Sequence, residues 1–196
     1  YFAGREALIN EENEYFMGLR QNCSHKSMIF YGLRGVGKTV LLNALRDLAE
    51  QNGVLSEFIE LSENGSFKNL ISLCAQKFIV RMSPIVKDQG LAAKSLSTLK
   101  AFQSAYSANS ESSLSVKTNP KNETLDFEYD LSELFIAMGT LARDTNSSIC
   151  LFIDEMQCLK TDELGALLTA VSQTYQKHLP IILFGAGLPQ TINILT

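Results

Sequence analysis

The sequence has no long apolar run and no large excess of charge of either sign. No stretch of about 18 apolar residues occurs, so we expect neither a transmembrane helix nor a membrane partner. The N-terminus of the given sequence lacks a basic segment followed by an apolar one, so we expect this segment not to be a secretory signal peptide. With 19% charged residues and a formal net charge of −4, the chain offers no general nucleic-acid-binding surface, although a local basic patch is compatible with this balance.

Paired cysteines and an initiator Met are absent as well. The cysteines are Cys23, Cys74, Cys150 and Cys158, and none of them forms a C-x-x-C pair. Cys150 lies in an apolar run, where a thiol behaves as a small hydrophobe. We therefore expect free thiols and a reducing, cytoplasmic setting. The missing Met and the end at Thr196, soon after an apolar run, favour a piece of a longer protein.

Short apolar segments alternate with segments of helical periodicity. Strands are predicted for Ser27–Tyr31, Val54–Leu61, Ile149–Ile153 and Ile181–Phe184, and helices for Lys38–Glu50, Ser66–Met82, Leu91–Tyr106 and Thr161–Lys177. A further helix is expected to start at a capping-box-like pair, Asp130 and Glu133, and to run to about Thr145. This alternation predicts a single α/β domain over residues 1–196, with a parallel sheet covered by helices on both faces.

Two segments are interpreted from their composition. The helix Ser66–Met82 has an apolar face that we expect in the core rather than in a partner groove; it consists of Phe67, Leu70, Ile71, Leu73, Cys74, Phe78 and Ile79. Residues 107–126 are mostly polar and contain Pro120, which predicts a mobile loop or insertion. The few lysines and arginines there favour a plain loop over a DNA-contacting or partner-binding insertion.

A complete phosphate-binding motif follows the first predicted strand and opens a helix. Residues 32–39 fit G-x-x-x-x-G-K-[ST], and the predicted nucleotide-binding residues are Gly32, Leu33, Arg34, Gly35, Val36, Gly37, Lys38, Thr39 and Val40. A triphosphate needs several converging backbone N–H groups, and glycine adopts the backbone angles that such a loop requires. We expect Lys38 to reach the β- and γ-phosphates and to act in catalysis, and Thr39 to ligate Mg²⁺. For the side chain of Arg34 there are two alternatives, contact with phosphate or a position in solvent.

Two adjacent carboxylates follow the apolar run Ile149–Ile153. In phosphoryl transfer, one carboxylate at the end of a strand can hold the Mg²⁺ shell, and a neighbour can orient and deprotonate water. We assign Asp154 to the metal and Glu155 to the water. Alone, such a pair is more often a helix cap, but downstream of a complete phosphate loop the catalytic interpretation is favoured. The predicted cofactors are ATP or ADP with Mg²⁺.

These two motifs resemble the Walker A and Walker B motifs of AAA+ and related additional-strand P-loop ATPases. The segment Phe2–Glu6 looks like the GRE box of the origin-recognition-like and STAND-like branches, which lies near the adenine. The resemblance thus implies nucleotide-binding roles for Gly4 and Arg5; a helix-capping turn is the alternative. Tyr31–Asn43 and Phe184–Pro189 look like bacterial ATP-binding proteins of that branch. The resemblance covers nearly the whole chain, apart from the polar segment.

The chain departs from this family pattern in three places. The family's sheet order implies that the strand Ile181–Phe184 lies between the strands that precede Gly32 and Asp154, where many AAA+ members carry a polar sensor. This chain has Gly185-Ala186-Gly187 there, which we interpret as a glycine turn closing the strand. No arginine follows Asp154 to act as a finger on a neighbouring subunit's nucleotide, and the helical lid is absent. We therefore expect the isolated chain to bind ATP better than it hydrolyses it.

Three classes of function fit these observations. The first is an ATPase switch that hydrolysis resets, and the second is a nucleotide-binding scaffold or signalling module with negligible turnover. The third is an ATP-dependent DNA-binding protein that acts through further C-terminal domains. Glu155 favours turnover, since binding alone needs no base, whereas the acidic balance disfavours DNA binding by this chain. A small-molecule kinase is less favoured because Glu155 follows Asp154 and no arginine-rich lid segment is present. Without an N-K-x-D sequence, ATP is favoured over GTP.

Overall fold

A four-stranded parallel sheet forms the centre of the computed structural model, which describes residue 16 and residues 26–106 and 126–189. The strands are β1 (Met28–Tyr31), β2 (Leu55–Glu60), β3 (Ile149–Asp154) and β4 (Ile181–Gly187). Their order across the sheet is β1-β4-β3-β2, and every neighbouring pair is parallel. The predicted α/β sheet is confirmed, and β4 lies between β1 and β3 as expected.

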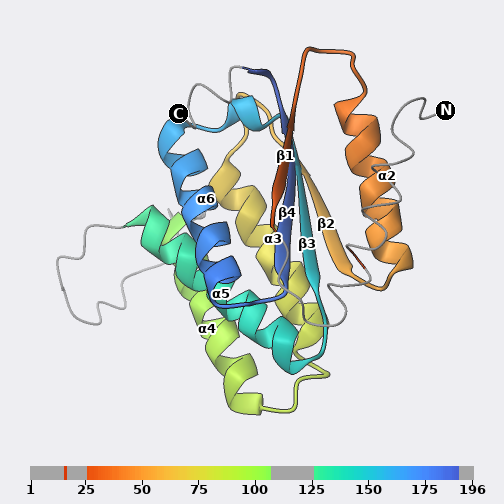
Figure 1. The fold of residues 1–196 in the computed structure, drawn as a ribbon. Coiled ribbons are helices and arrows are strands. Elements are labelled where there is room, and N and C mark those ends of the chain that lie inside the picture. Colours follow the sequence, from red (N-terminus) through yellow and green to blue (C-terminus); the bar gives the residue numbers. More distant parts are fainter. Residues whose placement is uncertain (1–15, 17–25, 107–125, 190–196) are drawn as a thin grey trace.

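Helices cover both faces of this sheet. They are α2 (Lys38–Gln51), α3 (Phe67–Met82), α4 (Gln89–Tyr106), α5 (Phe127–Asp144) and α6 (Thr161–Gln176), with a short 3-10 helix η2 (Met156–Cys158) after β3. Figure 1 shows α2 on one face and α3, α5 and α6 on the other. Helix α4 packs against α3 and α5. The three-layer arrangement therefore agrees with the prediction.

The alternating side chains of the two central strands divide the core in two. Every residue of β3 and β4 is buried. Facing α3, α5 and α6 are Ile149, Leu151, Ile153, Ile181 and Leu183, whereas Cys150, Phe152, Ile182, Phe184 and Ala186 belong to the smaller core beneath α2. The rings of Phe152 and Phe184 stack there, with centroids 5.5 Å apart. Helices on both sides require strands that are apolar at every position, which explains their continuous hydrophobic runs.

Helix α5 begins earlier than the sequence pattern indicated. Its N-cap is Asp126, whose carboxylate accepts hydrogen bonds from two backbone N–H groups of the first turn. The predicted capping pair of Asp130 and Glu133 is therefore wrong. The Asp130 carboxylate instead accepts a hydrogen bond from the Tyr106 hydroxyl at 2.6 Å, which joins the end of α4 to the start of α5. Burial and this bond raise the pKa of Tyr106, because both disfavour the phenolate.

Strand β4 extends three residues beyond the predicted Phe184. The segment Gly185–Gly187 continues the pairing with β1, with Gly187 opposite Tyr31, so its interpretation as a closing turn is wrong. The physical reason for a glycine at position 185 is close packing. A Cβ built there would overlap the sulfur of Met156, a buried residue of η2 that packs against the strand.

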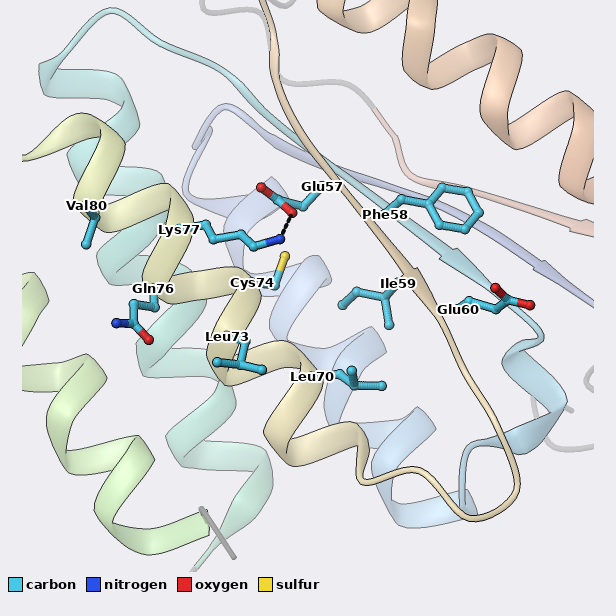
Figure 2. A pocket seen from close by; sticks show the side chains of 10 residues that line it. All are labelled: Glu57, Phe58, Ile59, Glu60, Leu70, Leu73, Cys74, Gln76, Lys77 and Val80. Carbon is cyan, nitrogen blue, oxygen red and sulfur yellow. Dashed lines mark hydrogen bonds and ion pairs between the residues drawn. The ribbon is translucent and has the colours of Figure 1, made fainter. Parts of the chain in front are cut away.

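Helix α3 leaves part of its apolar face outside the core. Phe67, Ile71 and Phe78 are buried as predicted, but Leu73 is 55% exposed, so its assignment to the core is wrong. Together with the exposed Val80 and the edge strand β2, Leu73 lines a groove of about 420 Å³ (Figure 2). A helix that packs on a sheet from one side buries only the stripe that faces the sheet, and Leu73 lies at the margin of that stripe.

The groove also contains an ion pair. Lys77 Nζ lies 2.6 Å from Glu57 Oε2, and this hydrogen bond raises the pKa of Lys77 (Figure 2). Burial raises the pKa of the Cys74 thiol beside it, so this cysteine stays protonated at neutral pH. The charges of Glu57 on β2 and Lys77 on α3 thus satisfy each other within the groove.

Several other sequence predictions concern cysteines, membrane spans and termini. Among the described residues, Cys74, Cys150 and Cys158 form no disulfide with one another, in line with the prediction, and Cys23 lies outside the described residues. Among the helices in the described part of the chain, none is long and apolar enough to cross a membrane. The Phe2–Glu6 segment and residues 107–125 also lie outside the described residues.

Candidate functional site

The loop between β1 and α2 depends on two glycines with left-handed backbone angles. Gly35 has φ 79° and Gly37 has φ 83°, values that disfavour side-chain-bearing residues. Gly37 is the N-cap of α2 and, as a glycine, has no side chain of its own that could accept from the first turn, whereas Ser66 caps α3 and Asp126 caps α5. Helix α2 therefore presents its first backbone N–H groups and the positive end of its dipole to the loop, an arrangement that attracts anions.

Lys38 occupies the interior of this loop. Its Nζ donates hydrogen bonds to the carbonyl oxygens of Gly32 at 2.8 Å and Leu33 at 2.9 Å. The loop is also attached to the neighbouring strand, because the Gly32 N–H donates to the carbonyl oxygen of Gly187 at 3.2 Å. The phosphate loop, the ammonium group and the end of β4 are thus directly connected.

The carboxylate of Asp154 joins β3 to the start of α2. Asp154 is only 2% exposed, and a buried carboxylate needs hydrogen-bond donors. One carboxylate oxygen accepts from the Glu155 backbone N–H at 2.8 Å, and the other accepts from the Thr39 hydroxyl at 2.5 Å. The sheet order makes this contact between residues 115 positions apart, since β1 and β3 both end at the same edge of the sheet.

Glu155 adopts a backbone conformation that is rare for its residue type. Its φ of 58° lies in the left-handed region, which costs a non-glycine residue about 1–3 kcal/mol and occurs preferentially at functional sites. This turn ends β3 and leads directly into η2. The Glu155 carboxylate accepts a hydrogen bond from the side-chain amide of Gln157. Sequence reasoning missed Gln157, whose only signal was a polar residue two positions after the acidic pair.

A cavity of about 530 Å³ lies between the loop and Glu155. Its lining consists of Arg34, Gly35, Gly37, Lys38, Thr39, Val40 and Glu155. The structure thus brings most of the predicted loop residues together with the predicted base, and Asp154 lies directly behind Thr39. Gly32 does not line the cavity, and Leu33 and Val36 are 71% and 47% exposed. Gly32 and Leu33 instead accept hydrogen bonds from Lys38 Nζ through their backbone carbonyl oxygens. Gly4 and Arg5 lie outside the described residues.

The charges around the cavity have opposite signs on its two sides. Lys38 and Arg34 belong to the loop, and Glu155 belongs to the end of β3. Nearby, burial raises the pKa of the Cys158 thiol, and the carboxylates of Glu155 and Glu63 raise it further. Cys158 is therefore a neutral thiol at pH 7 and not a nucleophile. The acidic group at the cavity wall is therefore the carboxylate of Glu155.

The oxygen donors at the cavity suit a small hard cation. The Thr39 hydroxyl and the Asp154 carboxylate are the ligand types that Mg²⁺ prefers, and they already lie in contact. Within the described ranges, no group of three or more His, Cys, Asp or Glu side chains is placed to hold a metal. A cation at this position would therefore draw further ligands from phosphate oxygens and water, as Mg²⁺ commonly does at nucleotide sites.

Comparison with known proteins agrees with this geometry. The AAA ATPase domain family matches residues 1–183, a range that contains the phosphate loop, Asp154 and Glu155. A search of curated proteins finds no match. The family indicates nucleotide binding and ATPase activity, and the parallel sheet with its phosphate loop has the corresponding architecture. The chain therefore belongs to the AAA ATPase domain family, the AAA-type P-loop ATPases.

Proposed function

We propose that this chain is an ATPase switch domain that binds ATP with Mg²⁺ on the loop Gly32–Val40 and hydrolyses the γ-phosphate. The observation that carries the proposal is that Glu155 faces the same cavity as Lys38 and Thr39. A glycine loop alone would suit many phosphate ligands. A carboxylate directed into the phosphate cavity adds a base, which binding alone does not need.

Binding would use the loop backbone and exchange the partners of Lys38. The N–H groups at the start of α2 would donate to the phosphates, and the ammonium group would leave the carbonyl oxygens of Gly32 and Leu33. A phosphate oxygen carries negative charge, so its attraction to the ammonium group exceeds that of a neutral carbonyl oxygen, which favours the exchange. After release of the γ-phosphate, Lys38 can return to the two carbonyls. This alternation supports a switch role.

Thr39 and Asp154 would hold Mg²⁺ beside the phosphates. Bound Mg²⁺ would neutralise the negative charge that develops on the β- and γ-phosphate oxygens. The Thr39 hydroxyl, which now donates to Asp154, would turn a lone pair toward the cation. Asp154 stays in place because the Glu155 backbone N–H holds its other oxygen.

Glu155 would orient the attacking water and accept its proton. The carboxylate is the acceptor for Gln157 and lies at the cavity wall, opposite the loop. An ionised carboxylate at the γ-phosphate side can take the proton as the water attacks. No arginine follows Asp154 to stabilise the transition state on a neighbouring subunit, so turnover by this chain alone should be slow.

The resemblance supports three further assignments. Gly4 and Arg5 would contact the adenine side of the nucleotide, as the likeness of Phe2–Glu6 to a GRE box implies. The chain would belong to the origin-recognition-like and STAND-like branch, and residues 1–196 would act as one nucleotide-binding domain.

The test compares ATP turnover of the unaltered chain with that of Glu155→Gln. We expect the variant to be slower by about 100-fold or more, because a general base is removed, while ATP affinity changes by less than about threefold. Glu50→Gln is the matched control, since Glu50 lies at the far end of α2 and its replacement can still accept the Ser56 hydroxyl. Equal rates for all three would remove the hydrolytic role and leave a nucleotide-binding scaffold.

A further inference from the structure

We infer that Gln157 is a positioning residue that holds the Glu155 carboxylate in a fixed position relative to the end of β4. Gln157 is half-buried in the middle of η2. Its side-chain N–H donates to Glu155 Oε2, and its side-chain carbonyl accepts the backbone N–H of Leu188 at 3.0 Å. One amide therefore joins the turn after β3 to the residue directly after β4. The inference rests on the proposed role of Glu155 in hydrolysis.

The two ends of this amide are not interchangeable. The Leu188 backbone N–H can only donate, so the Gln157 carbonyl oxygen must face it. The NH₂ group then faces Glu155, whose ionised carboxylate can only accept. Glutamine is the residue type of this length that satisfies both partners at once. Glutamate in its place would still accept from Leu188 but would have no proton for Glu155 at neutral pH.

The same turn is anchored on β4 a second time. Met156, which precedes Gln157, is fully buried and packs so closely on Gly185 that no Cβ fits between them. The next residues of β4 reach the phosphate loop, because Gly187 accepts the Gly32 N–H. A continuous set of contacts thus runs from Gly32 through the end of β4 and Gln157 to Glu155.

This connection gives the amide a role in geometry rather than in binding. Gln157 does not line the cavity, so its removal leaves the loop contacts to the nucleotide in place. Without the amide, the Glu155 side chain is free to rotate about its own bonds, and a misplacement of about 1 Å in a reacting group can lower the rate by about 100-fold. The expected signature is a loss in kcat without a matching loss in nucleotide affinity.

The experiment measures kcat and KM for ATP, and ATP affinity by calorimetry, in Gln157→Leu and Gln157→Glu of the full chain. We expect kcat to fall by about 10- to 100-fold in both variants, with KM and affinity within about threefold of the unaltered chain. Gln173→Leu is the matched control, a half-buried glutamine near the C-terminal end of α6, remote from the loop. Gln157→Glu preserves the shape and the Leu188 bond, so it serves if the Leu variant fails to fold.

A double-variant comparison separates positioning from a general structural role. In the Glu155→Gln background, Gln157→Leu should lower kcat no further, because the amide acts through the carboxylate that is already gone. An additional fall there, or a proportional loss of ATP affinity, would overturn the inference in favour of a structural role. If Glu155→Gln is slow while Gln157→Leu and Gln157→Glu turn over like the unaltered chain, this inference alone fails. If turnover does not depend on Glu155, the proposed function fails, and the inference with it.

Discussion

Two hollows of similar size lie on this domain, and they are built differently. The cavity at the phosphate loop measures about 530 Å³, and the groove between β2 and α3 measures about 420 Å³. In the first, an ammonium group, a hydroxyl and a carboxylate lie around an open space beside the N-terminal end of α2, whose N-cap is a glycine. In the second, the charges of Glu57 and Lys77 are paired with each other, and exposed Leu73 supplies apolar surface (Figure 2).

The two hollows differ in the convergence of polar groups and not in volume. The loop cavity carries two costly features, the left-handed backbone of Glu155 and a buried Asp154 carboxylate, both at its edge. The groove carries neither. It lies where the amphipathic helix α3 packs beside the edge strand β2, and its charges are paired with each other, with the Lys77 side chain 61% and the Glu57 side chain 16% exposed.

The largest effect should come from removing the ammonium group at the loop. Lys38→Ala is expected to weaken ATP binding by about 2–3 kcal/mol, roughly 30- to 150-fold, because a charged donor to phosphate is lost. Isothermal calorimetry with ATP and Mg²⁺ measures this. Lys77→Ala removes the lysine of the other hollow and should leave ATP affinity unchanged. Equal losses in the two variants would contradict the distinction between the hollows.

A medium effect is expected where the turn after β3 packs on β4. Gly185→Ala should lower the free energy of unfolding by about 1–3 kcal/mol, because the added methyl group overlaps buried Met156. Chemical denaturation measures the change. Gly165→Ala in α6 is the matched control: nothing lies near its Cβ position, so it should stabilise the helix by up to about 1 kcal/mol. Equal stability of the two variants would show that the turn after β3 accommodates the added methyl group and that its packing on β4 does not hold Glu155 in place.

The smallest effect should come from the apolar side chains of the groove. Leu73→Ser and Val80→Ser are expected to change the free energy of unfolding by less than about 0.5–1 kcal/mol and ATP affinity not at all, since both side chains are more than half exposed. Thermal unfolding and calorimetry on the same samples check both quantities. A large loss of ATP affinity in either variant would link the groove to the nucleotide site and contradict the distinction between the two hollows.

Local features were predictable from the sequence. The phosphate loop was one of them, because Gly35 and Gly37 occupy motif positions whose backbone angles depend on neighbouring residues alone. The start of α5 was not, although it is local in sequence. The pattern was interpreted as a start at Asp130 and Glu133, whereas Asp126 caps the helix and Asp130 accepts a hydrogen bond from the Tyr106 hydroxyl of another helix. That tertiary contact cannot be recognised from the local pattern.

Contacts that side chains make with residues distant along the chain were harder to predict from the sequence. The strand order that the resemblance implied places Asp154 at the same end of the sheet as the loop. The hydrogen bond between its carboxylate and Thr39 could not be predicted from that order and is seen only in the structure. The bond between Gln157 and Leu188 spans 31 positions and depends on η2 packing against β4. Nothing in the local pattern around position 157 indicates that the amide turns toward Glu155 rather than toward solvent.

By itself, the sequence determined the alternation of strands and helices, the phosphate loop and the acidic pair after β3. Hydrophobic periodicity and glycine backbone preferences act over a few residues, so they can be read along the chain. The tertiary structure decided which carboxylate contacts Thr39, why position 185 is a glycine, where Gln157 points and that Leu73 is exposed. These depend on distances between residues far apart in sequence, and such distances exist only once both faces of the sheet are packed.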